Sequence, residues 1–249
     1  MKTSEWGAML MDEVLKEIRQ FMETKANPEM AAKYTRYFRE GYEPFGITQA
    51  DLEVFKKSML QRYQPIWGIN EFFDLGDQLF ATGRYEEGGL AILLIAGLKT
   101  QFNRETINRI GNWLQNGVKN WAHSDVICSE LITPLWKKEL VTLTDISSWR
   151  ESDSKWQRRA AAVCLLPMVK KADDIAPYLE FVRPLMTDSV REVQQGTGWM
   201  LREAWKRHPS AAETFLLEYK DISPRLIIQY ATEKMSKEEK ARYKANKKP

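Results

Sequence analysis

Apolar residues recur at three- and four-residue spacing along most of this 249-residue chain, and alternation of period two is almost absent. Near the start, Met11, Val14, Leu15 and Ile18 fall on one face of a helix, with polar positions between them. The same pattern predicts helices over residues 8–23, 28–41, 48–63, 69–82, 85–101, 104–117, 125–138, 144–151, 155–171, 176–186, 190–206, 211–219 and 225–234. The chain is therefore predicted to be all-α.

The predicted helices are short and come in pairs, which is typical of a helical repeat protein. Residues 155–161 align with residues 192–198 at an offset of 37, and small residues fall together where helices would pack closely. Similar steps backwards reach the start of 125–138 and then 86–98. This pitch is typical of HEAT-type repeats of about 40 residues. We therefore expect a right-handed α-solenoid of about six helix pairs, a single domain over residues 1–233 with a concave groove.

The charge of the chain is unevenly distributed. There are 37 Lys and Arg against 34 Asp and Glu, a net charge of +3. Residues 234–249 hold seven bases and two acids, which leaves 30 bases and 32 acids in residues 1–233. Binding to a polyanion must therefore depend on a local patch rather than on the total charge. The Lys-rich tail, residues 234–249, is expected to be a helical end or disordered.

Several classes of protein are excluded by what the sequence lacks. No apolar run reaches the roughly 18–20 residues of a membrane span, and the first ten residues do not have the pattern of a signal peptide. The two cysteines, Cys128 and Cys164, lie in apolar contexts, which favours a reducing, cytoplasmic location. The two histidines and two cysteines form no zinc motif, and no phosphate-binding glycine loop is present. We expect no metal and no cofactor.

Trp121 and Asp125 are the first candidates for chemistry. Four residues apart, they would share one face of a helix. An aromatic ring and a carboxylate side by side can stabilise a bound cation. The structural alternative is that Ser124-Asp125 caps the helix predicted from residue 125, while Trp121 fills the core.

Further candidates lie on later helices or beside Trp121. Arg158 and Arg159 open a largely apolar helix, and either can bind phosphate or pair on the surface. Trp199 lies among small residues and is either packed in the core or stacked in a groove. His123 is either an acid/base group or a local hydrogen-bonding residue.

The order and spacing of several motifs resemble those of the AlkD-like, HEAT-repeat DNA alkylation-repair glycosylases. The resemblance covers most of residues 10–233. The motifs that carry it are Asn27-Pro28-Glu29, Arg36-Tyr37, Phe45-Gly46-Ile47, Trp121-Ala122-His123-Ser124-Asp125, residues 156–161 and residues 198–203.

The resemblance implies an enzyme that excises cationic alkylated purines, such as 3-methyladenine and 7-methylguanine, from double-stranded DNA, as a monomer and without a deep base-flipping pocket. It implies that Asp125 is the catalytic carboxylate, that Trp121 and Trp199 contact the deoxyribose, and that Arg159 holds a phosphate. His123, Arg158, Tyr37 and Thr48 are supporting candidates. In a bacterium such an enzyme would associate with the nucleoid.

The chain departs from the family pattern at two places. Ala122 follows Trp121 where the family often has an acid, and Thr48-Gln49-Ala50 replaces a polar residue followed by Thr-Pro. Two alternatives therefore stay open. One is a non-catalytic HEAT-repeat module that binds DNA structures, and the other is a scaffold for a protein partner.

Overall fold

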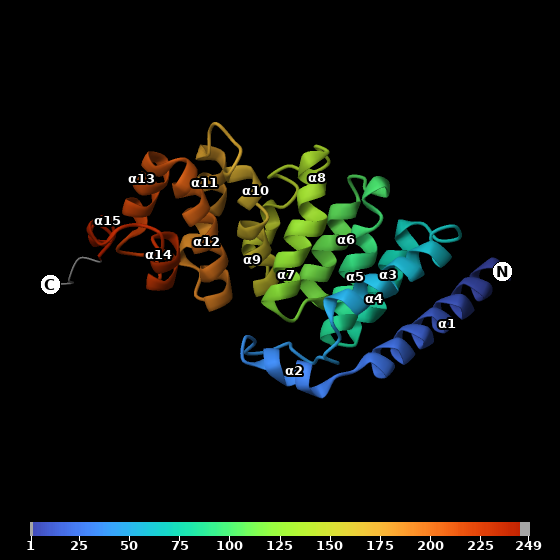
Figure 1. Cartoon of the computed structure of the whole chain (residues 1–249). Coiled ribbons are helices and arrows are strands. Elements are labelled where there is room, and N and C mark those ends of the chain that lie inside the picture. Colours follow the sequence, from blue (N-terminus) through green and yellow to red (C-terminus); the bar gives the residue numbers. More distant parts are fainter. Residues whose placement is uncertain (1, 245–249) are drawn as a thin grey trace. The chain divides into compact units, whose positions relative to one another are not determined.

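The computed structural model describes residues 2–244, and these residues are helical, with turns and loops between the helices and no β-strand (Figure 1). The prediction of an all-α fold is confirmed. The described chain divides into two compact units. The first comprises residues 1–113 and 117–126, and the second residues 114–116 and 127–249. The prediction of one continuous domain over residues 1–233 stays a prediction.

The first unit begins with a long helix and continues through shorter ones. Its helices are α1 (Lys2–Lys25), α2 (Pro28–Thr35), α3 (Gln49–Tyr63), α4 (Ile69–Ala81), α5 (Tyr85–Ala96), α6 (Thr106–Asn112) and α7 (Trp121–Ile127), of which the last residue belongs to the second unit. A 3₁₀ turn, η1 (Lys99–Gln101), follows α5, and a π-helical turn, η2 (Trp113–Gly117), follows α6.

The second unit is built of similar short helices. They are η3 (Cys128–Ile132), α8 (Thr133–Lys137), η4 (Ser147–Glu151), α9 (Lys155–Val163), α10 (Leu166–Val169), α11 (Ala176–Val182), η5 (Arg183–Thr187), α12 (Arg191–Arg207), α13 (Pro209–Tyr219), α14 (Arg225–Ala231) and α15 (Lys237–Ala241). The tail is therefore helical over α15, and residues 245–249 lie outside the described residues.

The structure corrects some of the predicted boundaries. The stretch 144–151 forms only the 3₁₀ turn η4, and 85–101 is divided near Gly97. The second helix ends at Thr35 rather than near Gly41. Gly41 has a positive φ of 64°, and a Cβ there would lie 2.0 Å from the carbonyl oxygen of Lys119. This glycine therefore allows a close backbone approach and does not end a helix.

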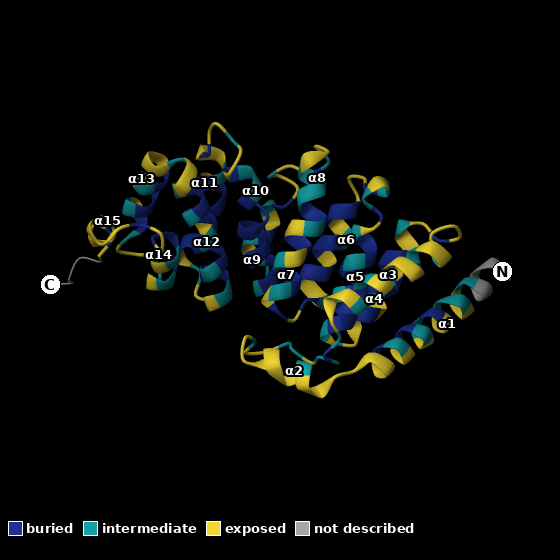
Figure 2. Ribbon diagram, viewed as in Figure 1, coloured by how far each residue is buried: buried dark blue, intermediate teal, exposed yellow. Residues whose placement is uncertain are grey.

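The predicted start of the second helix is confirmed. The Asn27 side chain accepts hydrogen bonds from the backbone N–H groups of Glu29 and Met30, both at 3.1 Å, and Pro28 occupies the first turn. The cap satisfies two amide groups that the helix itself leaves unpaired. No residue of α2 is buried, so this helix depends on its ends for its position (Figure 2).

The core of the first unit lies between α3, α4 and α5. Helix α5 packs against both of the others, and Leu75, Leu79, Leu90 and Leu94 are completely or almost completely buried there (Figure 2). These leucines recur at helical spacing, which is why periodicity predicted both helices. Burial of each such side chain contributes about 1.5–3 kcal/mol before entropy is counted.

The core of the second unit is centred on α12, which packs against α9 on one side and α14 on the other. A Cβ at Gly196 would lie 3.0 Å from Cγ of Arg159 on α9, and one at Gly198 would lie 2.5 Å from Cβ of Tyr230 on α14. The prediction that small residues mark close helix approach is confirmed at these two glycines.

Candidate functional site

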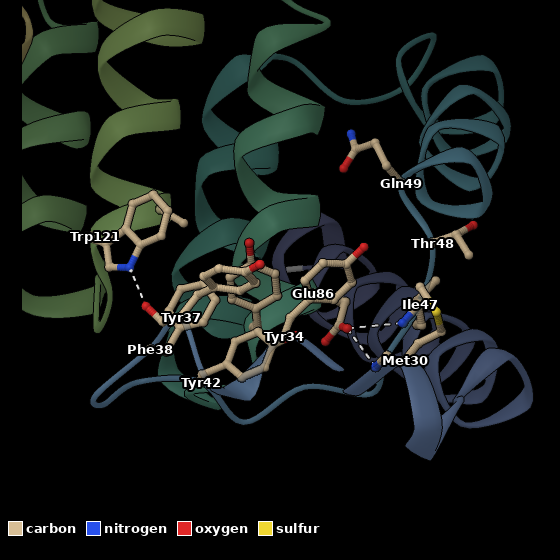
Figure 3. Close-up of a pocket in the computed structure, with 13 residues that line it drawn as sticks. Met30, Tyr34, Tyr37, Phe38, Tyr42, Ile47, Thr48, Gln49, Glu86 and Trp121 are labelled. Carbon is tan, nitrogen blue, oxygen red and sulfur yellow. Dashed lines mark hydrogen bonds between the residues drawn. The ribbon is translucent and has the colours of Figure 1, made fainter. Parts of the chain in front are cut away.

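The first unit contains a half-open hollow of about 600 Å³ (Figure 3). Its walls come from α2 and the loop that follows, the start of α3, the start of α5 and the start of α7. They are formed by Met30, Tyr34, Tyr37, Phe38, Tyr42, Gly46, Ile47, Thr48, Gln49, Tyr85, Glu86, Trp121 and Ala122. Volumes of 300–1,000 Å³ are usual for small-molecule sites. The hollow is therefore large enough for a ring system of nucleobase size.

Aromatic rings dominate the hollow. Phe38 lies between two rings, stacked on Tyr42 at 4.2 Å and on Trp121 at 5.4 Å between centroids. Tyr85 meets Phe38 and Tyr42 edge-on. Tyr34 and Trp121 are each 39% exposed. The inner rings therefore hold one another in place, while the outer rings present surface to solvent.

Glu86 fixes one wall of the hollow. Its buried carboxylate accepts hydrogen bonds from three consecutive backbone N–H groups, those of Phe45 at 2.8 Å, Gly46 at 2.7 Å and Ile47 at 3.1 Å. Gly46 has a φ of 84°, and a Cβ there would lie 2.0 Å from the Asn27 carbonyl oxygen. Only glycine fits this left-handed, crowded position, which explains the residue at the centre of the motif.

The Glu86 carboxylate also influences the phenols beside it. Burial, followed by the charge of Glu86, raises the pKa of Tyr42 to about 12. The same two causes raise the pKa of Tyr85. Both phenols are therefore neutral hydrogen-bonding groups at physiological pH, and neither is a base.

Basic side chains lie over the rings at the rim. The Lys33 amino group is 5.3 Å from the centroid of Tyr34, and the Arg36 guanidinium is 4.9 Å from that of Tyr37. Arg36 also donates a hydrogen bond of 2.8 Å to the Tyr37 hydroxyl. Rings and cations therefore alternate along residues 33–37, a combination found in sites that bind nucleic acid strands.

Trp121 and Asp125 both lie on α7, one turn apart, as predicted. The cap of this helix is Asn120, whose side-chain oxygen accepts a 2.9 Å hydrogen bond from the His123 N–H. The prediction that Ser124-Asp125 caps a helix is therefore wrong, because α7 starts four residues earlier. Trp121 donates from Nε1 to the Tyr37 carbonyl oxygen at 3.2 Å. Trp121 lines the hollow, whereas the half-buried Asp125 does not.

His123 is buried, with 6% of its surface exposed. Nε2 lies 2.9 Å from the Tyr85 carbonyl oxygen, which only accepts, so Nε2 carries the proton and Nδ1 accepts from the Asn120 amide at 3.2 Å. Burial lowers the pKa of His123 to about 4. The geometry matches the local hydrogen-bonding alternative, with a neutral imidazole that holds α7 to α5.

The other supporting candidates of this unit, Tyr37 and Thr48, both line the hollow. Tyr37 is 55% exposed. Thr48 caps α3 by accepting a hydrogen bond from the Asp51 N–H at 3.1 Å. The structure therefore brings Trp121, Tyr37 and Thr48 together, which the sequence spacing alone did not predict.

The candidates of the second unit are held by their own helices. Arg159 on α9 is only 6% exposed, and its Nη1 donates to the Glu192 carbonyl oxygen at 2.7 Å. Arg158 forms a 2.7 Å ion pair with Asp188 and donates to the Ser152 carbonyl oxygen at 2.6 Å. Trp199, on α12, is half-buried. Both arginines thus contribute to the packing of this unit.

Neither a metal centre nor a membrane span is found in the part of the chain that the structure describes. Its His, Cys, Asp and Glu side chains do not gather in groups of three that could hold a metal ion. None of its helices is long and apolar enough to cross a membrane. Both cysteines are buried, and burial raises the pKa of the Cys164 thiol to about 12. That thiol is therefore protonated and unreactive at neutral pH.

Most of the hollow was missed by sequence reasoning. Tyr34, Phe38 and Tyr42 are spaced by four residues, and three basic residues are interleaved among them in 33–39. That aromatic and basic pattern was the available signal. Residues 85–86 and 121–122 complete the hollow only through folding.

Three comparisons place the chain among known proteins. The family model for "DNA alkylation repair enzyme" matches residues 18–235. A solved structure from Enterococcus faecalis, described as a predicted DNA alkylation repair enzyme, is similar to the chain with a TM-score of 0.71 and 20% identity, over 86% of this chain and 98% of that one. No curated protein matches significantly. The structural likeness supports the predicted fold.

Proposed function

This chain belongs to the DNA alkylation repair enzyme family, and we propose that it is a DNA glycosylase that excises cationic N3- or N7-alkylated purines from double-stranded DNA. 3-Methyladenine and 7-methylguanine are the expected substrates. The family assignment supports DNA as the partner and alkylation repair as the process. The glycosylase reaction, a monomeric state and a cytoplasmic or nucleoid location are parts of the proposal.

The observation that carries the proposal is the pair Trp121 and Asp125 on α7. One turn apart, they present an indole and a carboxylate from the same side of one short helix. Asn120 caps that helix, so capping does not explain the acid at residue 125. Trp121 is exposed, so packing alone does not explain its indole.

The chemistry suits these groups. An N3- or N7-alkylated purine is already positively charged, so it leaves with the electron pair of the C1′–N bond and becomes neutral. Positive charge then develops on the deoxyribose. A carboxylate and an indole face stabilise such an oxocarbenium-like sugar. Water adds at C1′ and loses its proton to solvent, with Asp125 orienting the water. The reaction requires no redox step.

The remaining roles are proposed residue by residue. Trp199 contacts the deoxyribose, as does Trp121, and Arg159 binds a backbone phosphate through its guanidinium. Tyr37 and Thr48, which line the hollow beside Trp121, act in binding. His123 keeps α7 in position, and Arg158 supports the packing around Asp188. No metal or cofactor is assigned.

The test is release of 7-methylguanine from methylated duplex DNA by the full chain. Asp125→Asn removes the charge but keeps the shape, so we expect the rate to fall roughly 100-fold or more. Asp173→Asn changes an exposed acid of the second unit and is the matched control, with the wild-type rate expected.

Wild-type release no faster than that of Asp125→Asn would overturn the enzymatic proposal. Salt-sensitive binding to bulged or branched DNA with no release would instead select the non-catalytic module. Wild-type DNA affinity in Arg159→Ala, together with no release, would select a protein scaffold.

A further inference from the structure

The hollow beside Trp121 has a composition that the excision chemistry leaves unexplained. A carboxylate and an indole would suffice to stabilise a sugar cation, yet the hollow contains five further aromatic rings. Tyr34 and Tyr37 are 39% and 55% exposed, although large aromatic side chains are usually covered. Their open surface adjoins a volume of about 600 Å³. We infer that this hollow receives one unstacked nucleobase of the bound DNA strand.

The shape of the walls favours a planar ligand. Phe38, stacked between Tyr42 and Trp121, is held by contacts of nearly parallel rings, with interplanar angles of 2° and 16°. Tyr34 and Tyr37 lie 6.3 Å apart at the outer side. Figure 3 shows these rings between Trp121 at one side of the hollow and Thr48 and Gln49 at the other. A flat heteroaromatic ring can stack on such surfaces whatever its sequence identity, since every base has a π-face.

The charges at the rim favour a nucleotide over an uncharged aromatic compound. Lys33 and Arg36 lie directly over the Tyr34 and Tyr37 rings. A base stacked in the hollow would bring its own phosphate to the level of these cations. Phosphate accepts hydrogen bonds from guanidinium and ammonium groups, so one nucleotide satisfies both features.

The hollow is held open by fixed structure. The three N–H bonds to Glu86 and the left-handed Gly46 determine the path of the loop that forms one wall. The stack of His123 on Tyr85, at 4.8 Å and 14°, supports the base of α7 behind Trp121. A base would therefore enter a preformed site, which lowers the entropic cost of binding.

This inference rests on the proposed function, because it assigns the hollow to the DNA that the chain acts on. Its test, however, requires no catalysis. Fluorescence anisotropy would compare binding of the full chain to a duplex with one bulged adenine and to the same duplex fully paired. We expect the wild type to prefer the bulged duplex roughly tenfold, the scale of one base stacked on aromatic rings.

The variants assign that preference to the hollow. Tyr34→Leu with Tyr37→Leu should remove the preference and change affinity for the paired duplex less than about twofold. Tyr37→Leu alone, at an exposed position, should lower it and guards against misfolding of the double variant. Tyr178→Leu, on α11 of the second unit, is the matched control and should keep it.

Equal wild-type affinity for the two duplexes would overturn the inference, as would a preference that survives the double variant or is lost in Tyr178→Leu. Release of 7-methylguanine by the same proteins separates the two proposals. Release without a bulge preference overturns this inference and leaves the glycosylase. A bulge preference without release overturns the glycosylase and leaves this inference.

Discussion

The two units contain the same packing device with different side chains. In the first unit, His123 of α7 lies against Gly88 of α5, where a Cβ would come within 2.8 Å of the imidazole. In the second unit, Arg159 of α9 lies against Gly196 of α12, where a Cβ would come within 3.0 Å of the arginine stem. Each glycine makes room for a nitrogen-bearing side chain from a neighbouring helix.

Both side chains donate to a carbonyl within about one turn of that glycine, His123 to Tyr85 and Arg159 to Glu192. They differ in charge. Burial lowers the pKa of His123 to about 4, so it is neutral at pH 7, whereas a guanidinium keeps its charge. The first device is therefore purely structural and sensitive to acid. The second holds a permanent cation, which is what a phosphate contact requires.

The largest expected difference between the devices is their dependence on pH. Because the folded pKa of His123, about 4, lies below the ordinary 6.5, the unfolded chain takes up this proton first as the pH falls. The stabilisation is complete above about pH 6.5 and is lost between there and about pH 4, by about 3 kcal/mol in all. Urea unfolding of wild type and His123→Gln at a series of pH values measures it.

The His123→Gln protein should show a shallower fall in unfolding free energy over that range than the wild type. His208→Gln, which leaves His123 in place, is the control and should follow the wild type. Parallel curves for wild type and His123→Gln would contradict the assignment of a neutral buried imidazole.

A smaller effect is expected from filling the glycine of the first device. Gly88→Ala should lower the unfolding free energy by about 2 kcal/mol, since the added methyl would meet the rigid, buried imidazole. Gly89→Ala is a matched control on the same helix, where the nearest atom is 4.0 Å away. It should be neutral or up to about 1 kcal/mol stabilising, because alanine favours helix.

Gly196→Ala should cost less than Gly88→Ala, because the arginine stem can shift where the imidazole cannot. Thermal or urea unfolding of the three proteins ranks them. A Gly196→Ala loss larger than that of Gly88→Ala would show that the second device is the more rigid one and reverse the comparison.

The smallest effect separates a buried cation from an exposed one. Arg159→Ala and Arg36→Ala should each reduce the dependence of DNA affinity on salt by about one counterion. Only Arg159→Ala should also lower the unfolding free energy, by about 1 kcal/mol, because it loses the bond to Glu192. Titrations at several salt concentrations and urea unfolding give the two numbers. An unchanged salt dependence in Arg159→Ala would remove its phosphate role.

The elements that the sequence predicted well are those set by local rules. Leu90 and Leu94 mark the buried face of α5, and Asn27 caps α2, because periodicity and capping depend on residues a few positions apart. The stretch 144–151 failed for the same reason: it has helical spacing, but too little of it to extend beyond a 3₁₀ turn. The start of α7 was misplaced because Ser124 has the side chain of a cap, while Asn120 occupies the position.

The sequence by itself determined that this protein is all-helical, where most helices lie, and which residues resemble the alkylation-repair family. Tertiary structure alone decided that His123 is a neutral packing residue and that Trp121 shares a ring-lined hollow with Tyr34 and Tyr37. The reason is physical. A helix is specified by contacts between near neighbours, whereas the burial of an imidazole or the meeting of rings from residues 34, 85 and 121 depends on how distant segments pack.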